Sequence, residues 1–120
     1  MQTRYHDLPA LVTKDGSIVR EMMHPAVHGN RAQSLAEATV PAGCATLLHR
    51  HRVTEEIYHV TAGRGRMTLG GDTLDIGPGD TICIPPGTPH CVVNTGDGPL
   101  CILCCSSPAY AHDDTELLEA

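Results

Sequence analysis

The sequence predicts an all-β fold, a sandwich or barrel of antiparallel strands in one domain. Three observations support this prediction. Between residues 34 and 105, short apolar or alternating runs recur and Gly and Pro punctuate them, which is typical of strands rather than helices. The Gly70-Gly71-Asp72 step lies between two such runs and is a tight hairpin signal. At 120 residues, the chain has the usual size of a single domain.

The N-terminal residues 1–33 are less regular than the rest. The run SIVREMM at 17–23 could form one more strand ahead of a loop around Pro25 to Asn30. We expect this N-terminal arm to pack on the barrel or on a dimer partner.

Residues 34–105 form the predicted barrel. The turns 77–80 and 85–89 are rich in Gly and Pro and separate neighbouring strands. Phe and Trp are absent, so the core must be built from aliphatic side chains, Met and Cys. The expected strands cover residues 34–40, 45–51, 56–60, 65–69, 72–76, 80–84, 91–94 and 99–104.

Residues 106–120 form a polar, acidic C-terminal tail. Acidic residues of the tail flank Leu117-Leu118. The tail could form a short helix or a strap that docks on the rest of the chain. No repeat or linker separates it as a domain.

The composition excludes several classes of partner. The net charge is −6 and Lys14 is the only lysine, so no basic patch predicts nucleic-acid binding. The apolar stretches are too short and too interrupted for a membrane span or a secretory segment. The sequence therefore predicts a cytoplasmic protein that does not act at a membrane.

Six cysteines lie along the chain, and we expect reduced thiols because no secretory segment is evident. Cys101 and Cys104 have the spacing of a redox or zinc pair. On an extended strand, residues i and i+3 face opposite sides, so these two thiols are not expected to chelate one ion or form a disulfide. The sequence favours packing in the core or at an interface.

A group of histidines with a carboxylate carries the chemistry that the sequence predicts. His49 and His51 end an alternating run, and residues i and i+2 of a strand point to the same face. Glu55 and Glu56 follow after a short link, and either could supply the carboxylate. His90 follows a Pro/Gly-rich turn, which can bring it beside the first pair.

Three imidazoles and one carboxylate suit one divalent ion per chain, such as Mn, Fe, Co, Ni or Zn, and leave two of six octahedral positions for chemistry. The local charge of about +1 would attract a small substrate that is anionic, chelating or enolisable.

Tyr58 should face the same side as Glu56. Its hydroxyl could act as a catalytic group that orients a ligand, or only satisfy a core polar group. Arg64 and Arg66 could attract an anion or only add solubility.

Two spaced patterns resemble the motifs of the cupin superfamily. The first consists of Gly43, five residues, His49-x-His51, four residues, Glu56, six residues and Gly63. The distance from Glu56 to Gly63 matches the family pattern, which favours Glu56 over Glu55 as the carboxylate. Two long patterns in the right order rarely arise by chance.

The second pattern consists of Gly79, five residues, Pro85-x-Gly87, two residues, His90, three residues and Asn94. Together the patterns cover the predicted barrel. The resemblance implies a jelly-roll β-barrel with a metal inside, bound by the residues that stand here as His49, His51, Glu56 and His90. It also implies a homodimer, because small cupins with one barrel usually pair.

Fold does not fix function, and cupins include enzymes and binding proteins. The intact ligand set favours a metal-dependent oxygenase of the dioxygenase type, or a related oxidoreductase, acting on a small oxygen-bearing metabolite. The alternative is a sugar-phosphate or keto/enol isomerase, because the tail resembles that of small cupins described as mannose-6-phosphate-isomerase-like. The third reading is a non-catalytic metal or metabolite-binding module, which a pocket with room for water alone would favour.

Overall fold

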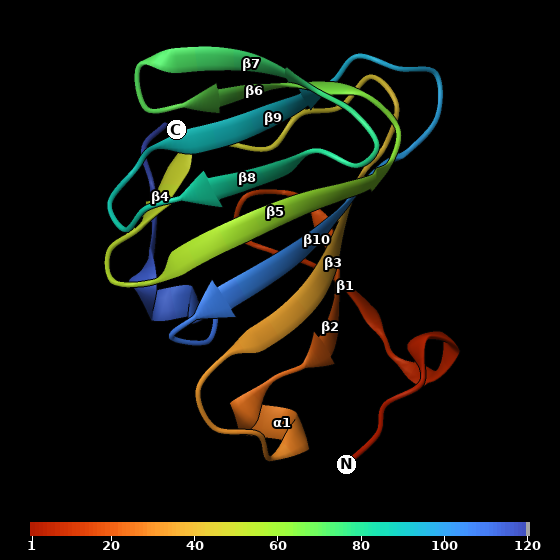
Figure 1. The fold of residues 1–120 in the computed structure, drawn as a ribbon, viewed down its shortest axis with the longest axis vertical. Coiled ribbons are helices and arrows are strands. Elements are labelled where there is room, and N and C mark those ends of the chain that lie inside the picture. Colours follow the sequence, from red (N-terminus) through yellow and green to blue (C-terminus); the bar gives the residue numbers. More distant parts are fainter. Residues whose placement is uncertain (120) are drawn as a thin grey trace.

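The computed structural model describes residues 1–119 and consists of two antiparallel sheets (Figure 1), which confirms the all-β jelly-roll fold. The helices are single turns at η1 (Tyr5–Asp7), α1 (Pro25–His28) and η2 (His112–Asp114). The larger sheet has the order β1 (Ala10–Val12), β2 (Ile18–Met23), β3 (Ser34–Val40), β10 (Leu100–Ser107), β5 (Glu55–Ala62), β8 (Thr81–Ile84). The smaller sheet has the order β11 (Thr115–Leu117), β4 (His49–His51), β9 (His90–Asn94), β6 (Gly65–Leu69), β7 (Asp72–Ile76).

Glycines allow two of the sharp turns between these strands. β6 and β7 form the hairpin that the sequence predicts, with Leu69 opposite Asp72 and Gly70 at a φ of +59°. Gly63 lies between β5 and β6 at a φ of +83°, and a Cβ there would lie 2.4 Å from the carbonyl oxygen of Pro99. A side chain cannot be accommodated so close to backbone, which explains the glycine that closes the first motif.

The predicted strand at 45–51 is shorter in the structure. Only His49–His51 pairs as a strand, and Ala45 makes a single bridge to Val93. In between, Thr46 exchanges hydrogen bonds with Val92, and the Leu47 amide donates to the carbonyl of Asp15 at 2.8 Å. The backbone hydrogen-bonding groups of residues 46–47 are therefore satisfied by two different segments, and no regular ladder of strand hydrogen bonds forms here.

The interior between the sheets is aliphatic at one end and polar at the other. Along β10, inward side chains alternate with outward ones and change from Leu100 and Ile102 to Cys104 and Ser106. β3 and β5 change in the same direction, because Leu100 lies opposite Val40, and Ser106 lies opposite Ser34 and Glu56. The fully buried aliphatic side chains are Val40, Val60, Met67, Ile84, Leu100 and Ile102, and each contributes about 1.5–3 kcal/mol.

The N-terminal residues extend the larger sheet, because β2 pairs with β3 and β1 pairs with β2 at its edge. The turn between β1 and β2 contains Asp15 and reaches the segment before β4, as the bond to Leu47 shows. The segment predicted as an arm thus lies against the barrel of its own chain.

The C-terminal tail packs along β4 and forms the edge strand of the smaller sheet. β10 continues to Ser107, and β11 pairs with β4, so that Thr115 lies opposite His51. Lys14 donates to the carbonyl oxygens of His112 and Thr115 and ties the tail to the N-terminal turn. Ala120, the last residue of the predicted tail, lies outside the described residues.

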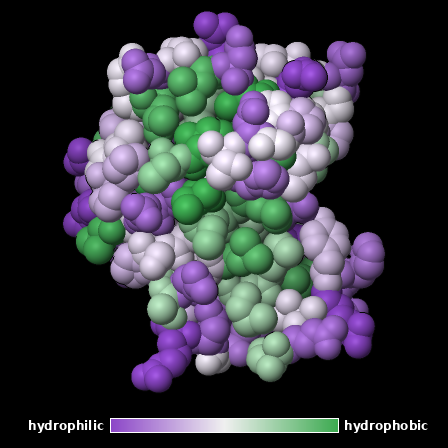
Figure 2. Space-filling view, viewed as in Figure 1, coloured by the Kyte–Doolittle hydropathy of each residue, from purple (hydrophilic) through white to green (hydrophobic). Residues whose placement is uncertain are grey.

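Apolar side chains also gather on the surface, and Figure 2 shows them as a band down the middle of this view. On the larger sheet, a row of outward side chains crosses five strands in register: Met23, Leu35, Cys105, Ile57 and Cys83. None of the helices within residues 1–119 is long and apolar enough to cross a membrane.

Candidate metal centre

Three histidines of the smaller sheet converge inside the barrel. His49 and His51 are 2% and 4% exposed, whereas Arg50 between them points outward to Glu116. His49 lies directly opposite His90 in the pairing of β4 with β9. Strand alternation and this register bring one ligand atom of each imidazole within 4.8 Å of the others. The three histidines could therefore hold a metal ion.

Glu56 reaches the same point from β5 of the facing sheet. Its Oε1 lies 3.1 Å from Nε2 of His51 and 3.5 Å from Nε2 of His90. Glu56 is 5% exposed, whereas Glu55 is exposed. Burial by itself raises the pKa of Glu56, but polar contact with His51 and His90 outweighs it and lowers the pKa to about 2. The buried carboxyl is therefore ionised.

Hydrogen bonds fix how the imidazoles are protonated. Nδ1 of His49 lies 2.7 Å from the Leu47 carbonyl, and Nδ1 of His90 lies 2.9 Å from the Thr88 carbonyl. A carbonyl only accepts, so both Nδ1 atoms carry the proton. In the neutral rings Nε2 then keeps its lone pair, which is the form that binds a metal. Burial and the neighbouring His90 lower the pKa of His49, which keeps that ring neutral.

His51 is oriented by the C-terminal tail. Its Nδ1 lies 2.9 Å from the Thr115 hydroxyl, and that hydroxyl donates to the Ala111 carbonyl at 3.1 Å. The single hydroxyl proton is therefore used, and Thr115 can only accept from His51. The three Nδ1 atoms are thus held by hydrogen bonds, and the three Nε2 atoms face inward, where they could bind a metal.

Two buried atoms at this point lack hydrogen bonds within the part of the chain that the structure describes. They are Oε1 of Glu56 and Nε2 of His90. Burying unpaired polar atoms costs about 1–3 kcal/mol each. A bound cation would satisfy both, so the donor set fits a divalent metal.

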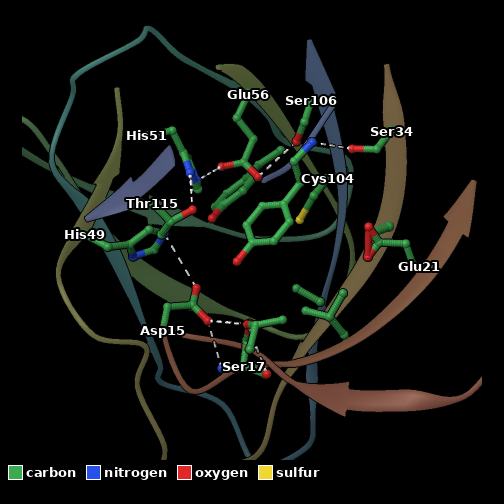
Figure 3. A pocket seen from close by; sticks show the side chains of 16 residues that line it. Asp15, Ser17, Glu21, Ser34, His49, His51, Glu56, Cys104, Ser106 and Thr115 are labelled. Carbon is green, nitrogen blue, oxygen red and sulfur yellow. Dashed lines mark hydrogen bonds and ion pairs between the residues drawn. The ribbon is translucent and has the colours of Figure 1, made fainter. Parts of the chain in front are cut away.

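A pocket opens beside the histidines (Figure 3). It leaves about 50 Å³ for the centres of water molecules, and one water needs roughly 10–15 Å³ on this measure. Tyr58, 7% exposed, lines the pocket, and burial raises the pKa of its phenol well above the ordinary value. Its ring lies edge-on to His90, with the centroids 5.9 Å apart. The protonated hydroxyl can therefore donate a hydrogen bond.

The structure also places residues at the pocket that the sequence analysis did not single out. Oδ2 of Asp15 lies 3.6 Å from Nε2 of His49. Tyr110 lines the pocket with its ring edge-on to His51, and its amide donates to the Ser34 hydroxyl. Asp15 lies in an ordinary Asp-Gly turn and Tyr110 in an irregular tail, so no local pattern places either of them near the histidines.

Arg64 and Arg66 do not line the pocket. Arg66 pairs on the surface with Asp75 at 3.8 Å, and the Arg64 side chain lies against Gly77. All six cysteines are free thiols, as expected. Cys104 lines the pocket, whereas Cys101 is on the other face of β10.

Comparison with known proteins gives one family and several relatives. The family model described as Cupin domain matches residues 36–106. An uncharacterized protein of Methanocaldococcus jannaschii is 53% identical over 119 residues, which are 99% of this chain and 95% of that protein. The mannose-1-phosphate guanylyltransferase ManC of Salmonella typhimurium is 35% identical over 72 residues, which are 60% of this chain but only 15% of the enzyme.

Among solved structures, the oxalate decarboxylase of Bacillus subtilis superposes with a TM-score of 0.81. The match has 24% identity and covers 96% of this chain and 31% of that chain. This likeness supports the fold alone, because one barrel fold carries many activities.

Proposed function

Because the chain belongs to the Cupin domain family, we propose that it is a metal-dependent oxygenase or a related oxidoreductase acting on a small oxygen-bearing metabolite. One observation carries the proposal. The Nε2 atoms of three histidines and one buried carboxylate meet at one place at the edge of a pocket that holds more than one water. Such a site can bind a substrate beside a metal.

The proposed ligands of one divalent transition metal per chain are His49, His51, Glu56 and His90. Three neutral imidazoles and one carboxylate suit Mn, Fe, Co, Ni or Zn. When bound, the ion would supply Lewis-acid polarisation of substrate oxygens and, if it is redox-active, electron transfer.

The chain's own residues would position the metal ligands and the substrate. The carbonyls of Leu47 and Thr88 and the hydroxyl of Thr115 hold the three rings in place. The Tyr58 hydroxyl would donate a hydrogen bond to a substrate oxygen at the inner end of the pocket. The Tyr110 ring covers His51 on the tail side. These fixed groups would orient a small substrate without a large rearrangement.

The relatives give limited support to the choice of substrate. The oxalate decarboxylase is named for a small chelating acid, and the guanylyltransferase is named for a mannose phosphate. A keto/enol isomerase remains the second candidate, because a Lewis acid beside a pocket can also stabilise an enolate. Its sugar-phosphate form lacks support, since no Lys or Arg of the described residues 1–119 lines the pocket.

The test combines metal content with oxygen consumption. Purified protein should carry close to one transition metal per chain, and the loaded protein should consume O₂ with at least one compound among small keto acids, diketones, phenols and sugars. Turnover without O₂ would favour the isomerase. Metal binding without any turnover would favour the binding module.

The carboxylate assignment has a matched control within the chain. Glu56→Gln should empty the site, whereas Glu55→Gln, at the exposed neighbour, should leave it full. If the second variant loses the metal and the first keeps it, Glu56 is not the ligand.

The proposal includes a homodimer of cytoplasmic chains. The apolar row from Met23 to Cys83 and the exposed Leu11 and Val12 of the edge strand β1 leave surface that a second copy would cover. Light scattering should give twice the chain mass at micromolar concentration, and Ile57→Lys should shift the protein to monomers. A monomer in the unmodified protein would exclude the dimer.

A further inference from the structure

The charge of the pocket contrasts with the charge of the metal. Among residues 1–119, three carboxylates line the pocket, those of Asp15, Glu21 and Glu56, and no Lys or Arg does. A divalent ion would contribute +2 and the carboxylates −3, so the occupied pocket would have a net charge of about −1. The local excess of positive charge that the sequence alone predicts is therefore reversed.

The nearest cations are held on the outside. Lys14 donates to two tail carbonyls. Arg20 precedes Glu21 on β2, so its side chain points to the opposite face of the sheet. There it donates to the Leu8 carbonyl and stacks on Tyr5. Arg50 pairs with Glu116. Each of these side chains has a partner outside the pocket, so none lies beside the carboxylates in its lining.

The two carboxylates that are not proposed metal ligands, Asp15 and Glu21, are called the outer carboxylates, and both have oxygens that are free to accept hydrogen bonds. Oδ1 of Asp15 accepts bonds from Thr13 and from the amide and hydroxyl of Ser17, which leaves Oδ2 facing the pocket near His49. Glu21 accepts no hydrogen bond in the part of the chain that the structure describes. His24 lies 3.5 Å from Glu21.

His24 does not neutralise Glu21. Nδ1 of His24 accepts from the Ala26 amide, so Nε2 carries the proton and donates to the Tyr110 carbonyl. Both ring nitrogens of His24 are therefore used by other partners, and Glu21 keeps its capacity to accept hydrogen bonds.

The pocket is also built for a ligand of only a few atoms. Its wall between the carboxylates is apolar and made of Val19, Ala36 and Ala38. At the inner end, the buried Oε1 of Glu56 and Nε2 of His90 have no partner among the described residues. These atoms independently mark the place where one end of a ligand would meet the metal.

We infer, on the basis of the proposed metal centre, that the pocket selects a small molecule with no negative charge at the end that lies away from the metal. One end of the molecule binds the metal through oxygen, and the other end donates hydrogen bonds from hydroxyl or ammonium groups to Asp15 and Glu21. A distal carboxylate or phosphate is rejected, because it would face two carboxylates in a half-buried site.

The test uses chelators with one metal-binding group and different distal groups. Acetohydroxamate has a distal methyl, glycolohydroxamate a hydroxymethyl, glycine hydroxamate an ammonium and malonomonohydroxamate a carboxylate. Their dissociation constants are measured at pH 7 by calorimetry on protein loaded with one metal per chain. Relative to the methyl probe, we expect the ammonium to bind roughly tenfold tighter, the hydroxymethyl about threefold tighter and the carboxylate roughly tenfold weaker.

Variants assign this order to the two outer carboxylates. Glu21→Gln and Asp15→Asn should each reduce the spread between the ammonium and carboxylate probes, and Asp75→Asn, with the same loss of charge on the far surface, should not. If the carboxylate probe binds as tightly as the methyl probe, the inference is wrong although the metal site stands. If the protein takes up no metal, or the loaded protein binds no hydroxamate, the proposed function fails and the inference fails with it.

Discussion

The two ends of the barrel interior differ although the same three strands build both. At the closed end, β3, β10 and β5 contribute Val40, Leu100 and Val60, which are 0–2% exposed. At the pocket end, the same strands contribute Ser34, Ser106 and Glu56. Large aliphatic side chains fill the space at the first end, and small or polar ones leave it open at the second. Packing and chemistry are thus separated along each strand, and the two can be tested apart.

The largest expected effect is the loss of the metal from the pocket end. His90→Ala should lower metal affinity more than about 100-fold, because a fixed imidazole with an oriented lone pair is lost. Competition with a chromogenic chelator measures the affinity. His59→Ala, at a histidine whose Nδ1 bonds instead to the Thr81 hydroxyl on an exposed surface, is the control. Equal affinities in the two variants would contradict the role of His90.

At the closed end, Ile102→Ala should lower the free energy of unfolding by about 2–5 kcal/mol, because the side chain is 1% exposed and its removal leaves a cavity. Chemical denaturation of the metal-free protein measures this loss. Metal affinity of the folded variant should change less than about threefold. A variant that loses stability and metal together would show that the two ends are not independent.

Acid should weaken the pocket end before it affects the closed end. The pKa of Glu56 falls on folding from 4.5 to about 2, so its contribution to stability is complete above pH 4.5 and is lost as pH falls toward 2. The pKa of His49 is also lowered on folding, so protonation below pH 6.5 favours the unfolded chain. The metal-free protein should therefore lose stability from pH 6.5 downward. Protonation of Glu56 between pH 4.5 and about 2 should lower the free energy of unfolding by on the order of 3 kcal/mol.

Denaturant titrations at several pH values measure this loss. In Glu56→Gln, the decrease between pH 4.5 and 2 should be smaller, while the decrease that begins near pH 6.5 should remain. An unchanged profile in that variant would show that Glu56 does not cause the loss.

Substitutions of Thr115 test how much the C-terminal tail contributes to metal binding at the pocket end. Thr115→Val keeps the shape but removes the acceptor of the His51 Nδ1 proton, and metal affinity should fall about 10–100-fold. Thr115→Ser restores the hydroxyl and should restore most of the affinity. If Ser binds the metal as weakly as Val, the tail acts through packing and not through this hydrogen bond.

The smallest effect is expected at the outer rim of the pocket. Glu21→Gln should leave metal affinity within about twofold of the unmodified protein, because Glu21 is 31% exposed at the side chain and, among the described residues, pairs with His24 and not with His49, His51 or His90. The same chelator competition measures it. A large loss would place Glu21 in the metal centre.

The sequence by itself determined the local structure of this protein, namely the faces of its strands and the positions of its turns. Strand alternation places His49 and His51 on one face, and the turn residues define where most strands begin and end, because both are properties of a few neighbouring residues. The motif spacing distinguishes Glu56 from Glu55, and the structure places Glu56 inside and Glu55 outside.

Only the tertiary structure decided what surrounds these residues. The His51–Thr115 and Tyr110–Ser34 hydrogen bonds join residues 64 and 76 positions apart, and Asp15 reaches His49 from a turn outside both motifs. No period of 2 or 3.6 encodes which distant segments meet, because that depends on how the sheets pair and on which side chains fill the space between them. The expectation of an anionic, chelating or enolisable substrate rested on the metal and its ligands alone, and only the folded chain shows that Asp15 and Glu21 also line the pocket.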